Sequence, residues 1–338
     1  MGKLLDTVGG RVVPMTLGNM DVSPFLLLAH HAHSFTPFDP TRTITNLVQP
    51  EGFPAHPHAG FSTLTITLEG GLAHRDSEGL SMDYSDGDAQ FMKSGRGVIH
   101  EEMWDLKRAT KNKQHKKIEI YQLWINSPTK TKFDLPQCAL LKAEDMSRGS
   151  VGDDCALDVV CGEVHVSGEV LVGPGSEMSE TPVCVMQVRI PSSSSKPMHL
   201  TTSADASLAV YVRRGSMLVD GVEAHPGSLT VFKHDSTSPL APLREATALL
   251  QAGAYGLDAL VLVGERIREP VVMSGPFVQA SERDYNIAAA AFQKIGYAGF
   301  WDYKVSEKEW RDHISSLDLQ GKIKEVLDQY RPTLEARE

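Results

Sequence analysis

Long apolar runs are absent from this sequence. No stretch approaches the ~18 consecutive apolar residues that a membrane-spanning helix needs. Residues 1–15 contain no long apolar core of the kind that a signal peptide carries. These absences predict a cytoplasmic protein without a membrane partner.

Cysteine is scarce in the chain. The 338 residues include only four cysteines, with no C-x-x-C pair: Cys138, Cys155, Cys161 and Cys184. They are too few for a disulfide framework, which favours a reducing compartment. We interpret them as buried or idle thiols and not as a zinc or redox site.

Basic residues are fewer than acidic residues in this chain, with 33 Lys and Arg against 43 Asp and Glu. The formal net charge of -10 argues against a general nucleic-acid binder, because phosphates repel an acidic surface. We therefore expect small molecules or proteins as partners and no direct contact with nucleic acid. One basic run, residues 106–119, is most simply a solvated loop, and a docking surface for an acidic partner is the alternative.

Long helical patterns are missing before residue 279. Short segments rich in Val, Ile, Thr and Tyr predict strands instead. Capping boxes at Ser281 and Ser306 predict helices over residues 281–295 and 306–330, with Pro332 ending the second. The chain is thus expected to be all-β with a helical tail. The predicted strands are residues 61–70, 118–126, 183–190, 208–215 and 258–265.

An internal echo predicts two barrel units. LTITLEGG and SDGDAQFM, within residues 64–92, resemble LAVYVRRGS and HPGSLTVF, within residues 208–232, at a displacement of roughly 140 residues. We therefore divide the chain into four parts. They are an N-terminal barrel (1–130), a connection with the start of the second barrel (131–180), a C-terminal barrel (181–278) and a helical tail (279–338).

The stretch EGFPAHPHAGFST places two histidines one residue apart, at the mouth of a strand. Side chains at i and i+2 of a strand share a face, so His56 and His58 can reach one point. If no bulge at Gly60 shifts the register, the pair faces the same side as Leu64 and Ile66. We therefore expect the pair to face a barrel interior.

A second stretch, SGRGVIHEEMW, supplies further ligand types after a Gly-rich turn. In a strand, His100 and Glu102 share one face and Glu101 points to the other. Three neutral imidazoles and a carboxylate inside an apolar barrel would be costly to bury without a cation. The pattern therefore predicts a metal site. A zincin motif is excluded, because H-E-x-x-H needs histidine at the position of Trp104.

Other polar residues near these stretches have simpler interpretations. His31 and His33 form a rival H-x-H pair, which we interpret, with His30, as pocket lining. We interpret His74 as a structural hydrogen-bonding residue.

Two residues of the predicted strand 118–126 share a face. Gln122 and Trp124 are interpreted as core packing, with cavity lining as the alternative.

The motifs HPHAG, LEGGLAHRDSEG, DGDAQFMKSGRGVIHEE and LWINSP resemble the pirin family of the cupin superfamily, as does EPVVMSGPF near the end of the chain. The resemblance covers most of the sequence. It implies two tandem cupin (jelly-roll) β-barrels with short C-terminal helices, the N-terminal barrel holding a metal. Carried over to this chain, the metal ligands are His56, His58, His100 and Glu102.

The chain also departs from the family pattern. Ala59 stands where the usual H-P-H-R-G motif has arginine, which puts substrate preference or charge near the metal in question. In the second barrel, the positions that echo the ligands fall near Thr202 and Leu240, with only His199 nearby. We expect no metal there.

The resemblance implies a dioxygenase of the quercetin 2,3-dioxygenase type, which cleaves the ring of a flavonol-like phenolic substrate. Open N and O coordination suits non-haem Fe(II), with Ni, Mn, Cu or Zn as other divalent metals. Glu102 would be both a ligand and the catalytic proton acceptor. The alternative is a non-enzymatic, iron-dependent redox sensor or transcriptional co-regulator that binds a protein partner, with the nucleus as a second location.

Overall fold

The computed structural model describes residues 5–7, 10–35, 51–105, 116–151, 155–166, 169–192, 194, 197–203, 205–233 and 245–334. Strands dominate, and α-helices follow them at the C-terminal end, as the sequence predicts. All five predicted strand segments are strands. Most of the basic run lies outside the described residues, since only its last four residues, 116–119, are included.

The chain forms two compact units that are discontinuous in sequence. We call Asp6–Val12, His30–Leu140 and Arg268–Glu338 the histidine unit, and Met1–Leu5, Val13–Ala29 and Leu141–Ile267 the apolar unit. Chain segments that are distant in sequence thus belong to one unit. The linear boundaries at residues 130, 180 and 278 stay a prediction.

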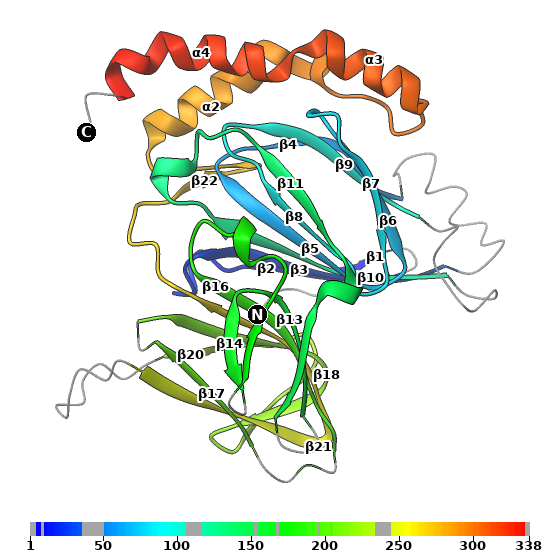
Figure 1. The fold of residues 1–338 in the computed structure, drawn as a ribbon, viewed down its shortest axis with the longest axis vertical. Helices are drawn as coiled ribbons and strands as arrows, with labels where there is room; N and C mark the ends of the chain where they lie inside the picture. Colours follow the sequence, from blue (N-terminus) through cyan, green and yellow to red (C-terminus); the bar gives the residue numbers. More distant parts are fainter. Residues whose placement is uncertain are drawn as a thin grey trace. The chain divides into compact units, whose positions relative to one another are not determined.

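The histidine unit is built around two facing β-sheets (Figure 1). The smaller sheet has four strands in the order β4-β9-β6-β7. They are β4 (Gly52–His58), β9 (Val98–Trp104), β6 (Gly71–Asp76) and β7 (Ser81–Ser85). The larger sheet has seven strands in the order β1-β2-β3-β10-β5-β8-β11, of which β2 and β3 belong in part to the apolar unit, since that unit includes Val13–Ala29. They are β1 (Leu5–Thr7), β2 (Gly10–Thr16), β3 (Phe25–Phe35), β10 (Lys116–Asn126), β5 (Phe61–Glu69), β8 (Ala89–Lys93) and β11 (Gln137–Leu141). A short pair, β22 (Val272–Ser274) and β23 (Phe277–Gln279), precedes the helices.

The apolar unit contains an eight-stranded sheet with the path β12-β13-β16-β21-β18-β19, from which β17 and β20 branch. These strands are β12 (Ser147–Val151), β13 (Cys155–Cys161), β16 (Val183–Ile190), β17 (Met198–Ser203), β18 (Ser207–Val219), β19 (Val222–Ala224), β20 (Leu229–Phe232) and β21 (Glu245–Gly264). A hairpin connects β14 (Glu163–Val166) with β15 (Glu169–Val172).

Short 3-10 helices also occur among the described residues of both units. They are η1 (Thr129–Thr131), η2 (Ala143–Asp145), η3 (Ser176–Met178) and η4 (Gly296–Gly299).

The sequence echo corresponds to equivalent strand pairs. Its first copy forms β5 and β8, which pair antiparallel, with Leu64 opposite Phe91. Its second copy forms β18 and β20, which also pair antiparallel, with Ala209 opposite Val231. The repeated sequence pattern therefore marks a repeated antiparallel strand pair, one in each unit.

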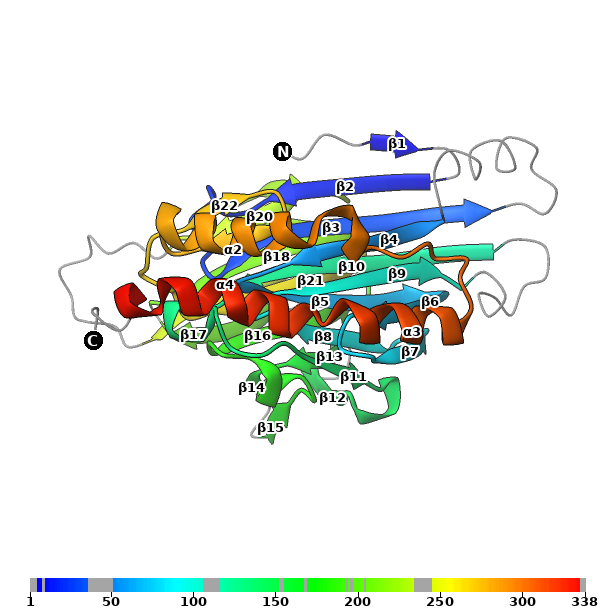
Figure 2. The same cartoon turned by 90° about the horizontal axis from the view of Figure 1, so that it is seen from above.

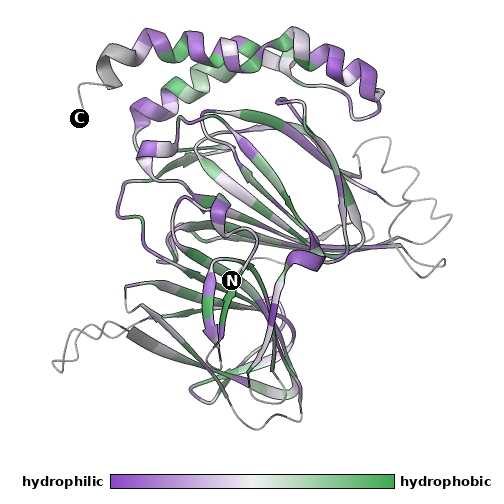
Figure 3. Ribbon diagram, viewed as in Figure 1, coloured by the Kyte–Doolittle hydropathy of each residue, from purple (hydrophilic) through white to green (hydrophobic). Residues whose placement is uncertain are grey.

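Three helices cover the outer face of the smaller sheet in the histidine unit (Figures 1 and 2). They are α2 (Glu282–Ile295), α3 (Glu307–Leu317) and α4 (Leu319–Leu334). Hydrophilic and hydrophobic residues alternate along them (Figure 3), so that Ile99 and Ala55 of the sheet pack against apolar side chains of the helices. Burial of that apolar face fixes one side of β4 and β9.

The helix predictions are correct in part. Ser281 accepts a hydrogen bond from the backbone N–H of Asp284 at the start of α2, and Ser306 forms the predicted capping box with Glu309. The predicted second helix is wrong as one element, because the chain turns at Asp318, whose φ of 43° is left-handed.

The turn at Asp318 lets the residue before it and the residue after it both reach the core. Leu317 and Leu319 are 4% and 3% exposed, and the Asp318 carboxylate accepts a hydrogen bond from the backbone N–H of Gly321, so the chain re-enters a helix at once. Pro332 does not end this helix, which continues to Leu334. Proline in the last turn of α4 removes the N–H that would bond the carbonyl oxygen of Asp328, so it weakens that turn without ending the helix. No described helix is long and apolar enough to cross a membrane.

Candidate metal centre

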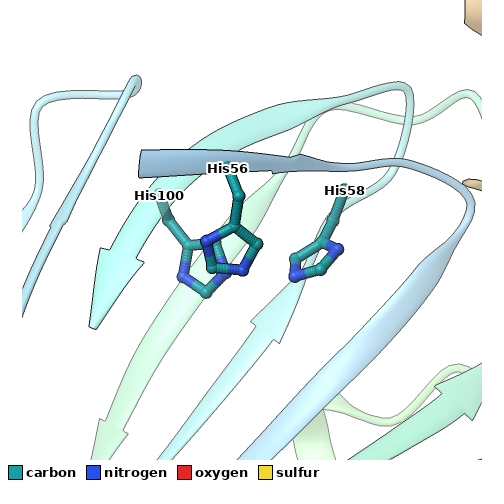
Figure 4. Close-up of side chains that lie close together, drawn as sticks. All are labelled: His56, His58 and His100. Carbon is teal, nitrogen blue, oxygen red and sulfur yellow. The ribbon is translucent and has the colours of Figure 1, made fainter. Parts of the chain in front are cut away.

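Three predicted histidines meet inside the histidine unit. His56 and His100 are directly opposite each other on the antiparallel strands β4 and β9. His58 lies two residues along β4 on the same face, and Figure 4 shows the three rings pointing the same way. One ring nitrogen from each lies within 4.8 Å of the others, and the ring centroids are 4.5 to 5.0 Å apart.

The pairing of β4 with β9 depends on Gly52. This residue has a φ of 132°, and a Cβ there would lie 2.5 Å from the Glu102 carbonyl oxygen. Glycine alone allows that close approach of the two backbones. A register shift between Phe53 and His56 then sets His56 opposite His100.

The two faces of these strands differ sharply in chemistry. Glu101 points to the helix side, where it accepts a hydrogen bond from Arg75 Nε at 2.5 Å and is 2% exposed. Arg75 also donates to the carbonyl oxygens of Tyr303 and Val305, ahead of α3. Glu102 faces the interior with His100, so the strand-parity prediction that separates the two glutamates is confirmed.

Glu102 is fully buried among hydrogen-bond donors. Its Oε1 accepts from Tyr84 Oη at 2.5 Å and from Thr65 Oγ1 at 2.9 Å, and its Oε2 accepts from Gln122 Nε2 at 2.8 Å. Burial and the Glu102 charge raise the pKa of Tyr84 well above its usual value, so this phenol stays protonated and donates. Glu102 is not part of the three-histidine cluster itself. Its role as a metal ligand stays a prediction.

One parity expectation is wrong. Thr65 reaches Glu102, and Phe61 packs on the His58 ring at 5.0 Å, so the odd-numbered residues of β5 face the histidines. Leu64 and Ile66 therefore face the other side. The cause is the turn at Gly60, which has a φ of 84° and whose Cβ would lie 1.9 Å from the Val278 carbonyl oxygen. The turn resets the strand parity, and the interior is more polar than expected.

Gln122 and Trp124 of β10 line the interior, which was the alternative interpretation. Gln122 binds Glu102, and the Trp124 ring lies 5.4 Å from His58 and 4.5 Å from Phe61. Alternation along β10 brings both to the face of the histidines. Phe61 and Trp124 give that face an aromatic wall.

The histidines of β3 separate according to strand parity. His30 bonds Glu119 at 3.0 Å and packs on Tyr121, on the face opposite Gln122. His31 and His33 point to the other face, against Phe53 and Trp104 respectively. Burial lowers the pKa of His31 to about 3 and that of His33 to about 4. The rival pair lines the interior beside the site, outside the three-histidine cluster.

A further group lies in the same interior. His74 Nε2 and Asp76 Oδ2 are 3.1 Å apart, which is the structural hydrogen bond predicted for His74. The Cys138 thiol of β11 joins them, so that ligand atoms of these three residues lie within 4.8 Å of one another. Sequence reasoning missed this group, because Cys138 is distant in sequence and carries no motif.

The histidine cluster fits a metal ion. Burial and neighbouring imidazoles hold the pKa values of His58 and His100 well below the usual 6.5, and burial lowers that of His56, so all three rings are neutral at neutral pH. Both ring nitrogens of His100 are buried without a hydrogen-bond partner among the described residues, and those of His58 lack a hydrogen bond of normal geometry. A cation would satisfy these lone pairs.

His56 is already oriented for coordination. Its Nδ1 lies 2.8 Å from the Pro54 carbonyl oxygen, so Nδ1–H donates there and Nε2 keeps its lone pair.

Ala59, at the position where the related motif has arginine, faces away from the cluster. It is fully buried and packs with Phe277 and Ala288 on the helix side. Its backbone bonds Pro276 and Val278. The Ala59 methyl group therefore contributes to the packing under α2.

Comparisons with known proteins agree with this architecture. A family model described as Pirin matches residues 10–125, and one described as Pirin C-terminal cupin domain matches residues 185–298. A Vibrio cholerae protein named "Putative quercetin 2,3-dioxygenase" is 31% identical over 242 residues, which span 70% of this chain and 78% of that protein.

Solved structures share the fold. A quercetin 2,3-dioxygenase from Acinetobacter baumannii aligns with a TM-score of 0.71 at 23% identity, covering 86% of this chain and 93% of its own. A bacterial pirin from Escherichia coli in complex with nickel(II) aligns with a TM-score of 0.51 at 14% identity, covering 79% of this chain and 96% of its own. The predicted fold class, two cupin domains with short C-terminal helices, is confirmed.

Proposed function

This chain belongs to the pirin family, and we propose that it is a metal-dependent dioxygenase that cleaves the ring of a flavonol-like phenolic substrate. One observation carries the proposal: the rings of His56, His58 and His100 converge, and the ring nitrogens of His58 and His100 are buried without a hydrogen bond among the described residues. The quercetin 2,3-dioxygenase names of the similar proteins suggest the substrate class.

His56, His58 and His100 would hold the metal, and Glu102 would complete the set. We propose Fe(II), because imidazole and carboxylate ligands suit it, while Ni, Mn, Cu and Zn also accept such ligands. When bound, the metal supplies Lewis-acid chemistry that makes a phenolic hydroxyl more acidic and one-electron chemistry suited to dioxygen.

Glu102 is the group that would move the substrate proton. Its carboxylate already accepts from Thr65, Tyr84 and Gln122, so these donors fix its position and stabilise its negative charge. A hydroxyl of the substrate that displaced one donor could give its proton to the freed oxygen. Tyr84 and Gln122 are then positioning residues for this base.

The aromatic wall would orient the substrate ring. Phe61 and Trp124 stand beside His58, and planar phenolic rings pack well against such faces. Because Phe61, Trp124 and His58 are held on paired strands, the ring would meet the metal site in one orientation.

The alternative, an iron-dependent sensor or transcriptional co-regulator, comes from the family resemblance, and the basic run at residues 106–119 would be its docking surface. Residues 106–115 lie outside the described part of the chain, and no observation favours a protein partner. A nuclear location stays a prediction for the same reason. We therefore propose the enzyme.

The test combines metal analysis of protein purified from its own cells with oxygen uptake on a panel of polyphenols that includes quercetin. We expect uptake to follow iron content, and His56→Ala with His58→Ala to abolish both the uptake and the iron. His199→Ala is the matched control, because His199 is an exposed histidine of the apolar unit, and it should retain both. A folded, fully metallated protein that consumes no oxygen with any phenol would contradict the enzyme.

A further inference from the structure

The interior of the histidine unit contains a second group of metal-ligand types, separate from the three histidines. His74 and Asp76 come from β6 and Cys138 from β11, and their ligand atoms lie within 4.8 Å of one another. None of the three belongs to the His56, His58 and His100 cluster. We propose that His74, Asp76 and Cys138 form a second metal site, which takes a thiophilic divalent cation such as Zn2+.

Strand alternation brings two of the ligands to one face. On β6, Arg75 points to the helix side and pairs with Glu101, so His74 and Asp76 both point inward. Cys138 approaches from the larger sheet, where β11 is the neighbour of β8. The three side chains therefore converge from two facing sheets, and three protein ligands leave one position of a tetrahedral cation for water.

The carboxylate is fixed before any cation binds. Asp76 Oδ1 accepts from the backbone N–H groups of Glu78 at 2.9 Å and Leu80 at 3.0 Å, in the turn that follows β6. These bonds leave Oδ2 directed at His74. Orientation of this kind is what hydrogen bonds behind a metal ligand provide.

One ring nitrogen of His74 has no hydrogen bond among the described residues, which is an independent indication of a bound cation. Its side chain is 0% exposed, one ring nitrogen bonds Asp76, and Nδ1 has no partner among the described residues. Since either ring nitrogen can carry the proton, one lone pair remains for a cation. A buried nitrogen without a partner is otherwise unfavourable.

The charges and ligand atoms select the class of metal. A Cys138 thiolate and the Asp76 carboxylate together carry two negative charges, which a divalent cation neutralises, and the thiol proton passes to solvent on binding. Sulfur, nitrogen and oxygen ligands suit Zn2+ or Co2+. The three-histidine cluster has no thiolate, so the two sites differ in spectroscopic signature.

The proposal goes beyond the oxygenase function and does not depend on it. The ring centroids of His74 and His100 are 5.4 Å apart, so a cation bound by His74 would add positive charge beside the first site. Occupancy of one site should therefore weaken cation binding at the other.

Cobalt titration of the metal-free protein tests the proposal, because a thiolate bound to Co2+ gives a charge-transfer absorption that imidazole ligands do not. We expect the His56→Ala, His58→Ala variant to bind one Co2+ with this absorption. Adding Cys138→Ser should abolish the absorption and weaken binding about tenfold or more. The matched control is Cys184→Ser, a buried cysteine of the apolar unit, which should keep the absorption.

The protein without substitutions provides the second measurement. Its absorption on Co2+ binding does not depend on how any variant folds. There the thiolate absorption should appear as Co2+ is added, and Cys138→Ala should remove it. No thiolate absorption in the parent at saturating Co2+, or an absorption that persists in both Cys138 variants, would overturn the proposal.

Discussion

The interiors of the two units differ although both are built on the same strand pairing. In the apolar unit, side chains such as Val210, Leu250 and Val261 form one continuous hydrophobic core. In the histidine unit, the face around the metal ligands carries Thr65, Tyr84, Gln122 and Glu102. The backbone fold alone therefore does not determine function. The inward-facing residues decide whether a barrel is a scaffold or a functional site.

The comparison also separates two sources of stability. The apolar core is stabilised by burial alone, which scales with apolar area. The polar interior depends on hydrogen bonds and, in our proposal, on a cation, because the ring nitrogens of His58 and His100 have no hydrogen bond among the described residues. Substitutions should therefore affect the two units through different measurements.

The largest effect is expected at the paired glutamates of β9, which face opposite sides. Glu101→Gln removes one partner of a buried ion pair with Arg75 and should cost roughly 3–5 kcal/mol of unfolding free energy. Glu102→Gln should instead weaken metal affinity by about 10–100-fold. Urea unfolding and metal titration of both variants measure the two effects. Equal loss of metal affinity in both would remove Glu102 from the site.

Metal removal should distinguish the two units directly. A metal present at about 1,000 times its Kd stabilises the native state by ~4 kcal/mol, so chelation should speed amide exchange in β4 and β9 by up to about a thousandfold. Exchange in β18 and β21 of the apolar unit should not change. Hydrogen-exchange mass spectrometry reports both regions in one experiment, and a uniform response would count against a site confined to one unit.

Acid should weaken the histidine unit first, because the buried histidines among the described residues all belong to it. Burial lowers the pKa values of His31 to about 3 and His33 to about 4, so the unfolded chain binds more protons below pH ~6.5. Stability is therefore fully present above that pH and is lost as pH falls toward 4, at up to ~1.4 kcal/mol per pH unit for each histidine.

The double variant His31→Gln, His33→Gln tests this origin of the pH dependence. It should flatten the dependence of the unfolding free energy between pH 6.5 and 4, measured by urea unfolding at each pH. His199→Gln, on the apolar unit, is the matched control and should leave the slope as it is. An unchanged slope in the double variant would place the acid sensitivity elsewhere.

The smallest effects are expected from two opposite substitutions, one that adds a buried hydroxyl to the apolar unit and one that removes a buried hydroxyl from the histidine unit. Val210→Thr buries a hydroxyl in the apolar core and should cost about 1–3 kcal/mol. Thr63→Val should be close to neutral, because Thr63 is fully buried and its Oγ1 has no partner among the described residues. Thermal and urea unfolding check both, and a large loss in Thr63→Val would reveal a hydrogen bond that matters to the polar interior.

Sequence reasoning succeeds here where a structural feature depends on residues that lie one or two positions apart in a strand. The alternation of β9 separates Glu101 from Glu102, and the H-x-H spacing brings His56 and His58 together. It fails at Asp318, where a left-handed residue divides the predicted helix. At Gly60 the sequence marks a residue that can shift the strand parity, but whether it does depends on contacts with residues distant in sequence, such as Val278.

The group around Cys138 shows a different limit. His74 and Asp76 lie on one strand, β6, but Cys138 reaches them from another sheet. Its position depends on the pairing of strands distant in sequence, which a single chain does not reveal. The discontinuous units escaped prediction for the same reason, since the C-terminal helices return to the N-terminal barrel.

That return has a consequence for biosynthesis. The three histidines leave the ribosome early, the strands of the apolar unit follow, and Arg268–Glu338, which belongs with the histidines, comes last. Until then Ile99 and Ala55 have no helices to pack against. A message truncated before residue 268 would still encode every proposed ligand, yet its product would expose apolar strands and attract chaperones and proteases. Folding of the histidine unit thus depends on the synthesis of Arg268–Glu338, although that segment supplies no proposed ligand.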